Sequence, residues 1–227
     1  MLLAIEDFKG LGSIEALLTI SHHLQKSLDT GMEFYIVQLD FSAAFDRVSH
    51  SGLLSKLKFI GIGGSVLAIC MEFLSNRRQR VVVDGATSEW IPIVAGVPLG
   101  SMLDHLLFIL YTGEMFELVE NRLYAYADDS ILLAVVLKPA QRAAVAETLN
   151  RDLSRIQEWC NQWCMILNPN KTKAVVVSRS RTVNPPHGDL ALSGISICAS
   201  PNLYILGVKF NNWLTFEDHK CVVLSLV

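Results

Sequence analysis

Two adjacent carboxylates interrupt the most apolar part of this sequence. Residues 123–127 and 130–137 are apolar runs of strand length, and Asp128 and Asp129 stand between them. Two such runs joined by a short polar break predict a β-hairpin with both carboxylates at its tip. Neighbouring carboxylates repel each other and raise each other's pKa unless a cation neutralises them. The fold is therefore expected to place this tip either in solvent or beside a bound cation.

A third carboxylate follows another strand-like run. Residues 33–39 (Glu-Phe-Tyr-Ile-Val-Gln-Leu) are rich in β-branched and aromatic side chains, and Asp40 comes directly after them. Carboxylates without His or Cys favour a hard cation such as Mg²⁺, and two such ions about 3.5–4 Å apart serve nucleotidyl transfer. Most Asp-Asp dipeptides are solvated turns. The strand residues on both sides of this pair favour the metal interpretation.

Helical and strand-like patterns alternate along the rest of the chain. Apolar residues at spacings of three and four predict helices over 13–30, 51–59, 65–74, 101–111 and about 145–164. Strand patterns cover 33–39, 123–127, 130–137, 173–177, 190–192, 195–198 and 204–208, and 79–83 with 90–94 predict a second hairpin around an Asp-Gly turn. This order predicts an α+β domain whose mostly antiparallel sheet carries helices on one face.

Composition limits the class of protein. The chain has 227 residues, of which 51% are hydrophobic and 18% charged, so it can bury a core as one globular domain or two joined subdomains. Its longest clean apolar stretch, residues 131–137, is too short to span a membrane, and residues 1–10 lack a signal-peptide layout. An intracellular protein with no membrane partner is expected. The net charge of −3 predicts no strong intrinsic attraction to nucleic acid. If nucleic acid is the partner, either the positive groove is local or the missing positive charge lies on parts that this chain lacks.

Several segments resemble the motifs of reverse transcriptases. Residues 126–129 (Tyr-Ala-Asp-Asp) are similar to the Tyr-x-Asp-Asp signature of that family. Further segments resemble motifs of its non-LTR retrotransposon (LINE-type) branch in order and spacing: 40–50 (Asp-Phe-Ser-Ala-Ala-Phe-Asp-Arg-Val-Ser-His), 96–101 (Gly-Val-Pro-Leu-Gly-Ser) with 106–108, 167–172 (Leu-Asn-Pro-Asn-Lys-Thr), 204–208 (Tyr-Ile-Leu-Gly-Val) and 214–219 (Leu-Thr-Phe-Glu-Asp-His). The resemblance runs from about residue 9 to 219.

The resemblance implies a right-hand polymerase palm with partial fingers and a largely missing thumb. Fingers-like parts would cover residues 1–32 and 50–95, the palm 33–49 and 96–180, and the palm end with the start of the thumb connection 181–227. The implied activity is RNA-directed DNA synthesis. It would use two Mg²⁺ (or Mn²⁺) ions, an RNA or DNA template with a primer, and deoxynucleoside triphosphates.

The resemblance also implies roles for individual residues. Asp40, Asp128 and Asp129 would hold the metal ions, and Lys171 would neutralise or protonate the leaving pyrophosphate. Phe45 would stand against the 2′ position of the sugar and disfavour ribonucleotides. The other implied nucleotide-binding positions are Ala43, Leu99, Gly100 and Tyr126. Arg77, Arg78 and Arg80 could touch phosphates, although such a cluster is more often a solvated face.

The departures from the family fall on positions that handle the substrate. Leu99 stands where Gln is usual and has no hydrogen-bonding group to offer, and Ala43 stands where Lys is usual. Asp104-His105 replaces the Gly-Pro that normally follows the loop serine, and Phe8 aligns with an Arg of the fingers. The sequence thus resembles a truncated copy of a retroelement polymerase that has kept its metal carboxylates.

Three functions remain open from the sequence. The first is a reverse transcriptase domain with weak or no activity in this fragment. The second is a catalytically silent remnant of the same fold that binds nucleic acid or a protein partner. The third is a small two-metal phosphodiesterase or nuclease, for which the additional acidic or His ligands are absent from the sequence. The oligomeric state is not predicted.

Overall fold

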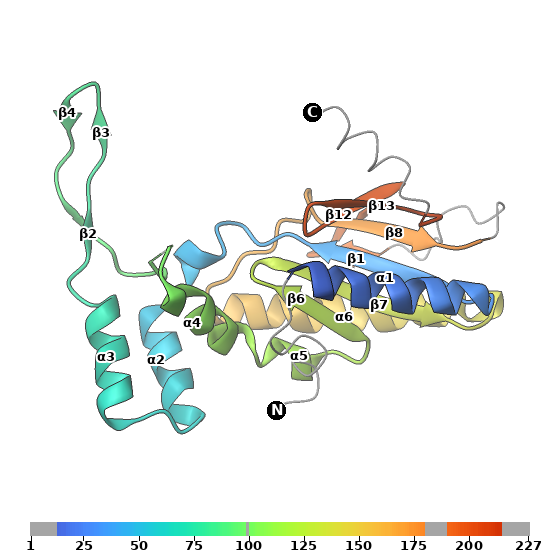
Figure 1. The fold of residues 1–227 in the computed structure, drawn as a ribbon, viewed down its shortest axis with the longest axis horizontal. Coiled ribbons are helices and arrows are strands. Elements are labelled where there is room, and N and C mark those ends of the chain that lie inside the picture. Colours follow the sequence, from blue (N-terminus) through green and yellow to red (C-terminus); the bar gives the residue numbers. More distant parts are fainter. Residues whose placement is uncertain (1–12, 99, 180–189, 215–227) are drawn as a thin grey trace. The chain divides into compact units, whose positions relative to one another are not determined.

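The computed structural model describes residues 13–98, 100–179 and 190–214, and these form two compact units (Figure 1). The first unit contains the described residues of 13–41, 115–158 and 167–214. The second contains those of 42–114 together with 159–166. In the described part of the chain, no helix has both the length and the apolarity that crossing a bilayer requires.

The first unit is built on a five-stranded sheet. Its strand order is β11-β8-β1-β7-β6, in which β1 pairs antiparallel with β7 and β8, β6 pairs antiparallel with β7, and β11 joins β8 in parallel. The strands are β1 (Glu33–Leu39), β6 (Arg122–Tyr126), β7 (Asp129–Val136), β8 (Lys173–Val177) and β11 (Cys198–Ala199). The predicted α+β class with a mostly antiparallel sheet is confirmed.

Helix α1 (Ser13–Asp29) covers one face of this sheet. Phe34 and Ile36 of β1 join Leu24 and Leu28 of α1 in one buried cluster, which explains the apolar periodicity of the helix. The hairpin of β12 (Asn202–Ile205) and β13 (Val208–Asn211) contributes Phe210 to the same cluster. The sheet face and the hairpin therefore share a single core with α1.

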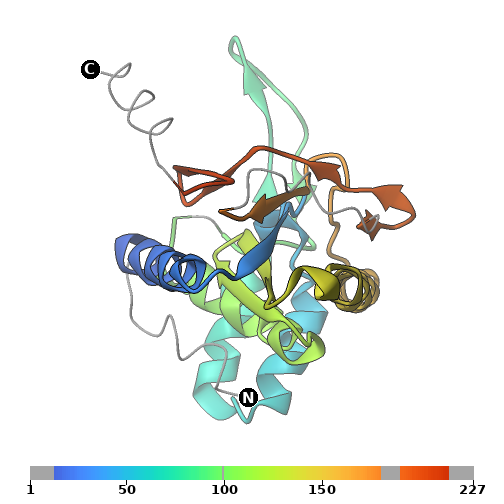
Figure 2. The ribbon, with the colours of Figure 1, turned by 90° about the vertical axis from the view of Figure 1, so that its right-hand side faces the viewer.

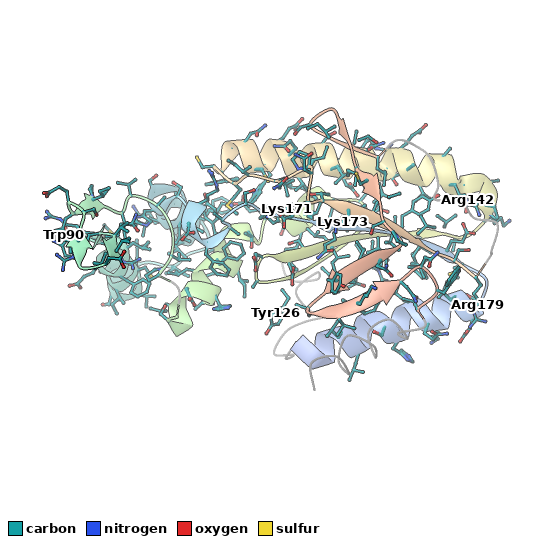
Figure 3. The ribbon with its side chains drawn as sticks, turned by 90° about the horizontal axis from the view of Figure 1, so that it is seen from above. Trp90, Tyr126, Arg142, Lys171, Lys173 and Arg179 are labelled. Carbon is teal, nitrogen blue, oxygen red and sulfur yellow. The ribbon has the colours of Figure 1, made fainter. Side chains whose placement is uncertain are left out.

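The sheet is also covered on its opposite face, by α6 (Arg142–Gln162) (Figures 2 and 3). The prediction of helices on one face alone is therefore corrected to one long helix on each face. The reason lies in the strands: six of the seven residues of β1 and six of the eight residues of β7 are buried, so neither face of these strands can be left in water.

A charged pair joins α6 to the sheet. The buried Glu33 carboxylate accepts hydrogen bonds from Arg142 Nε at 2.8 Å and Nη2 at 2.7 Å, and from Ser178 Oγ at 3.0 Å. The bidentate bond from Arg142 lowers the pKa of Glu33, although burial acts in the opposite direction. Glu33 is thus held as a carboxylate at the start of β1.

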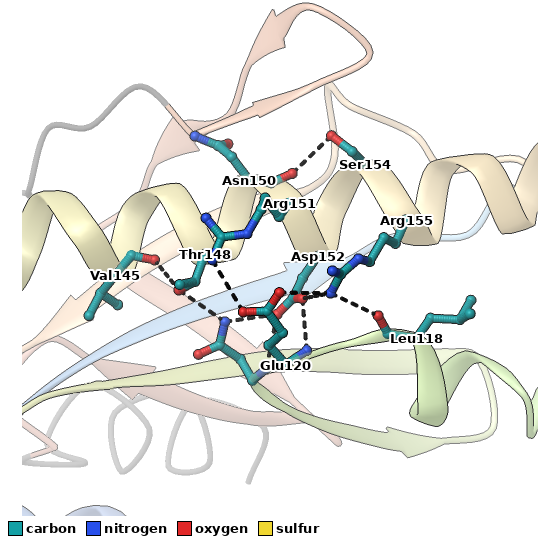
Figure 4. Close-up of polar contacts among 10 residues, drawn as sticks. Leu118, Glu120, Val145, Thr148, Asn150, Arg151, Asp152, Ser154 and Arg155 are labelled. Atoms are coloured by element: carbon teal, nitrogen blue, oxygen red, sulfur yellow. Dashed lines mark hydrogen bonds and ion pairs between the residues drawn. The ribbon is translucent and has the colours of Figure 1, made fainter.

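A second buried carboxylate, Asp152 of α6, anchors the segment that leads into β6 (Figure 4). Its side chain is fully buried and accepts hydrogen bonds from the backbone N–H groups of Glu120 at 2.8 Å and Asn121 at 3.0 Å, and from the Asn121 side-chain amide at 2.8 Å. Arg151 and Arg155 form ion pairs with Glu120 nearer the surface. The start of the β6–β7 hairpin is therefore tied to α6.

The C-terminal strands differ from the sequence prediction. Residues 204–208 form the hairpin of β12 and β13 rather than one strand, because Leu206 and Gly207 turn the chain with φ values of 49° and 80°. Leucine rarely adopts this left-handed conformation, so only the glycine signalled a turn. Residues 195–198 are likewise divided: β10 (Ile195–Ser196) pairs with β9 (Ala191–Leu192), whereas Cys198 begins β11.

The second unit contains three helices and a β-ribbon. The helices are α2 (His50–Phe59), α3 (Gly64–Leu74) and α4 (Met102–Thr112), with short η2 (Phe45–Arg47) before them; α5 (Met115–Leu118) and η3 (Pro139–Gln141) belong to the first unit. In the ribbon, β2 (Arg78–Gln79) pairs with β5 (Ile91–Pro92) and β3 (Val82–Val83) with β4 (Ala86–Thr87). Asp84 and Gly85 adopt positive φ at its turn, which confirms the predicted second hairpin.

A buried lysine lies in the core of the second unit. Lys56 is 3% exposed, and its Nζ donates to the Tyr111 carbonyl oxygen at 2.6 Å and pairs with Glu114 at 3.0 Å. The same nitrogen lies 3.8 Å from the ring centroid of Trp163 and 5.0 Å from that of Trp159. Burial lowers the pKa of Lys56, and Glu114 opposes this effect.

Candidate active site

Three carboxylates lie at one end of the five-stranded sheet. Asp128 lies in the two-residue turn of the β6–β7 hairpin, where the Tyr126–Asp129 pair closes the ladder, and Asp129 is the first residue of β7. On the neighbouring strand Leu39 pairs with Ser130, so one further step in the same register places Asp40 opposite Asp129. The antiparallel pairing thus brings together acids that are 88 residues or more apart in the sequence.

The three carboxylates line one open pocket with a volume of about 420 Å³. Lys171 and Lys173 also line it and lie close together where β8 begins (Figure 3). The remaining lining residues are Gln38, Leu39, Phe41, Asn170 and Tyr204. The pocket therefore combines a group of acids with two cationic side chains.

The surroundings of Asp129 perturb its carboxyl group. Its pKa is raised above the ordinary value, first because the side chain is half-buried and then because the charges of Asp128 and Asp40 lie nearby. A hydrogen bond with the backbone of Leu206 acts in the opposite direction. A bound cation would relieve both the burial cost and the repulsion.

The donor set fits a hard divalent cation, because carboxylate oxygens are the ligands that Mg²⁺ and Mn²⁺ prefer. As they stand, the described side chains include no group of three His, Cys, Asp or Glu residues gathered closely enough to hold a metal ion. Binding an ion would therefore require Asp40, Asp128 and Asp129 to draw together around it.

A turn over residues 168–172 fixes the end of β1. The Asn168 N–H donates to the Asp40 carbonyl oxygen at 2.8 Å, and the Asp40 N–H donates to Thr172 Oγ1 at 3.4 Å. Thr172 is fully buried and its hydroxyl donates to the Asn168 carbonyl oxygen at 2.9 Å. These bonds position Lys171, which is exposed, at the pocket beside Asp40.

Lys173 and Tyr204 are among the lining residues that were not predicted as site residues from the sequence. Lys173 enters because β8 pairs with β1 so that Lys173 lies opposite Gln38. Tyr204 enters because its carbonyl oxygen accepts a hydrogen bond from Gln38 Nε2 at 2.6 Å. Lys173 depends on strand pairing with β1 and Tyr204 on a hydrogen bond with Gln38, and both contacts join residues more than 130 positions apart in the sequence.

Tyr126 occupies a neighbouring position. It is 41% exposed and, together with Asp129, lines a small apolar cavity under Ile205 and Leu206 instead of the larger pocket. The structure thus places Tyr126 beside one metal-ligand candidate.

The predicted nucleotide-binding residues Ala43, Phe45 and Gly100 belong to the second unit, whereas Leu99 lies outside the described residues. Phe45 is half-buried and stacks on Phe108, with ring centroids 4.4 Å apart. Ala43 is exposed in the left-handed conformation, with φ at 50°. Nothing polar is present on its side chain to contact a phosphate.

The loop that begins at Gly96 is bound to the Phe45 segment. Gly96 N–H donates to the Val48 carbonyl oxygen at 2.8 Å, and Val97 N–H donates to that of Phe45 at 3.0 Å. Gly96 has φ at 91°, and a Cβ there would lie 3.0 Å from backbone atoms of Asp46, so only glycine fits. Backbone hydrogen bonds within the second unit therefore link the motif over residues 40–50 to the motif over residues 96–101.

Comparison with known proteins agrees with these motifs. The family described as "Reverse transcriptase (RNA-dependent DNA polymerase)" matches residues 7–210. The chain is 33% identical over 189 residues to the RNA-directed DNA polymerase from mobile element jockey of Drosophila melanogaster, covering 80% of this chain and 20% of that protein. It is 28% identical over 219 residues to the probable RNA-directed DNA polymerase from transposon BS of the same species, covering 93% and 24%. The chain thus spans about a quarter or less of these relatives.

Solved structures support the fold. Apo telomerase from Candida tropicalis, truncated from its C-terminal domain, superposes with a TM-score of 0.58 at 18% identity, covering 88% of this chain and 38% of that one. Telomerase from Candida albicans, solved in complex with a fragment of telomeric RNA, gives a TM-score of 0.56 at 14% identity, covering 92% and 36%. The polymerase palm expected from the sequence is confirmed at the level of the fold.

Proposed function

Because the chain belongs to the reverse transcriptase family, and specifically to the kind found in non-LTR retrotransposons, we propose that it carries the chemical centre of an RNA-directed DNA polymerase. The observation that carries this proposal is that Asp40, Asp128 and Asp129 line one pocket together with Lys171. The reaction joins the primer 3′-hydroxyl oxygen to the α-phosphorus of a deoxynucleoside triphosphate, breaks the bond between that phosphorus and the bridging oxygen, and releases pyrophosphate.

The three carboxylates would hold two Mg²⁺ or Mn²⁺ ions. Bound there, the ions would lower the pKa of the primer hydroxyl and stabilise the charge on the pyrophosphate. Lys171 stands at the same pocket, where its ammonium group would neutralise or protonate the leaving group. Phe45 would exclude the ribose 2′-hydroxyl, and its stacking on Phe108 would hold the ring in place.

A specific observation favours one alternative, a catalytically silent remnant that binds nucleic acid or a partner. Leu99 and Ala43 lack the polar groups usual at their positions, and Ala43 is exposed with nothing in place of the missing ammonium group. Lost positioning of the nucleotide by about an ångström can cost on the order of 100-fold in rate. The choice between the two functions is therefore a question of rate.

Primer extension separates these functions. The assay uses Mg²⁺ or Mn²⁺ with primed RNA and DNA templates at low salt, where a chain of net charge −3 binds nucleic acid best. Extension by the unmodified chain that disappears in Asp128→Asn supports the polymerase. Asp84→Asn removes one exposed charge at the ribbon turn and should retain activity. No extension by either protein would indicate the silent remnant, whereas equal extension above background in both would show that Asp128 is not needed and would overturn the proposed site.

Metal binding gives a second test that does not depend on activity. An ion that binds only the folded chain stabilises it by RT ln(1 + [L]/Kd), or about 1.4 kcal/mol at ten times Kd. For a chain of this size the thermal midpoint should rise by about 3–6 °C. Asp128→Asn should remove most of this rise and Asp84→Asn should leave it intact. An equal rise in all three proteins would place the ion elsewhere.

A further inference from the structure

A buried carboxylate and an exposed imidazole form a pair at the start of α4. Asp104 is fully buried, and its Oδ1 lies 2.8 Å from Nδ1 of His105, whose ring is 63% exposed. The same oxygen accepts the His105 N–H at 2.6 Å, and Oδ2 accepts the Gly100 N–H at 2.8 Å. Ser101 Oγ caps the helix by accepting the Asp104 N–H at 3.1 Å. The pair thus joins the imidazole to the loop at Gly100.

The hydrogen bonds define how the imidazole is presented. Burial alone would raise the pKa of Asp104, but the bonds from His105 and Gly100 outweigh burial and lower it. An ionised carboxylate can only accept, so His105 Nδ1 must donate to it. In the neutral ring this leaves Nε2 as an acceptor with its lone pair directed away from Asp104.

The imidazole also lies beside the aromatic residue proposed to meet the sugar. The ring centroids of His105 and Phe45 are 5.5 Å apart, with the planes tilted by 58°. The Phe45 ring stacks on the ring of Phe108, with the two centroids 4.4 Å apart. A molecule placed against Phe45 would therefore lie within reach of His105 Nε2.

We propose that His105 accepts a hydrogen bond from the 3′-hydroxyl of the incoming deoxynucleoside triphosphate, with Asp104 as the residue that positions its ring. This inference rests on the proposed polymerase function, since it needs a nucleotide sugar beside Phe45. In the proposed function Phe45 stands at the 2′ side of the sugar, which leaves the 3′-hydroxyl as the sugar donor that His105 would meet. Asp104 and His105 stand where the family usually has Gly-Pro, so the contact would come from residues particular to this chain.

Dideoxynucleotides test this contact because they lack only the 3′-hydroxyl. In equilibrium titrations with Mg²⁺, the unmodified chain should bind dGTP about 3- to 10-fold more tightly than ddGTP. This ratio is the contribution to affinity expected of one hydrogen bond between neutral groups. In His105→Ala the two affinities should become equal. The control is Ile109→Ala, which changes an exposed side chain one turn further along α4 and should keep the preference. An unchanged preference in His105→Ala would overturn the proposal.

The imidazole can also be observed directly. The His105 Cε1–H signal is identified by its loss in the His105→Ala spectrum, and it should shift more with dGTP than with ddGTP. Nucleotide binding that leaves this signal unmoved would overturn the role of His105 and leave the proposed function intact. If neither nucleotide binds at millimolar concentration while the chain remains folded, the proposed function fails, and this inference fails with it.

Discussion

The substitution Asp152→Asn tests what positions the carboxylate hairpin. Asp152 is fully buried, and its two oxygens receive three N–H groups from Glu120 and Asn121, directly before β6. Asparagine has the same shape but offers one oxygen and one NH₂ group. The best orientation keeps the two bonds from Asn121 and turns the NH₂ group toward the Glu120 N–H, which is then left without an acceptor.

The size of the effect follows from these bonds. Losing one hydrogen bond to a charged group costs about 1.5–3 kcal/mol, and the two remaining bonds weaken because the acceptor is no longer charged. The free energy of unfolding should fall by about 2–4 kcal/mol in total. For a chain of this length the thermal midpoint should drop by about 5–15 °C.

Urea and thermal unfolding, followed by circular dichroism, measure this change. The matched control is Ser154→Ala on the exposed side of the same helix, where the hydroxyl donates only to the Asn150 carbonyl oxygen. The control should unfold close to the unmodified chain. If Asp152→Asn unfolds together with the control, the buried hydrogen bonds of Asp152 do not hold the segment before β6.

Three further predictions concern Glu33, Lys56 and the pair Leu99 and Ala43. Because the pKa of Glu33 is lowered in the folded chain, its bond to Arg142 stabilises the fold fully above the ordinary value of 4.5, and this stabilisation is lost as the pH falls through the lower folded pKa. Urea unfolding between pH 5 and about 2 should show this loss as a fall in the free energy of unfolding. The same fall with pH in Glu33→Gln would contradict the prediction. Lys56→Met should change the free energy of unfolding by less than about 1 kcal/mol, because methionine keeps an apolar side chain of similar length. Lys56→Ala should lower it by about 2–5 kcal/mol, because the aliphatic part of the side chain is lost from its place against the aromatic rings. Equal effects of the two variants in denaturant melts would argue against this prediction. Leu99→Gln with Ala43→Lys should raise primer extension by roughly 10- to 100-fold at high primer-template concentration, if each contact contributes in the transition state, and a double mutant no faster than Asp128→Asn would count against it.

The sequence predicted an element well where a short local pattern determines it, such as an apolar run of strand length or an Asp-Gly turn. Strands β1 and β8 begin and end as expected, since their bounds depend on apolar runs next to Asp40 and before Ser178. The Asp84-Gly85 turn was also predicted, because its positive φ values demand such residues. The turn at Leu206 was missed, since a leucine in the left-handed conformation is held there by the hairpin and gives no sign of it in the sequence.

The sequence alone determined which side chains could carry the chemistry: Asp40 after one strand and Asp128 with Asp129 between two others. Their chemical type is enough to favour a hard cation. Tertiary structure decided which of them face one pocket, because the pairing of Leu39 with Ser130 brings Asp40 opposite Asp129. It also brought Lys173 to the pocket and His105 to Phe45. Such neighbours depend on strand register and helix packing between distant segments, and short-range patterns in a chain do not encode these.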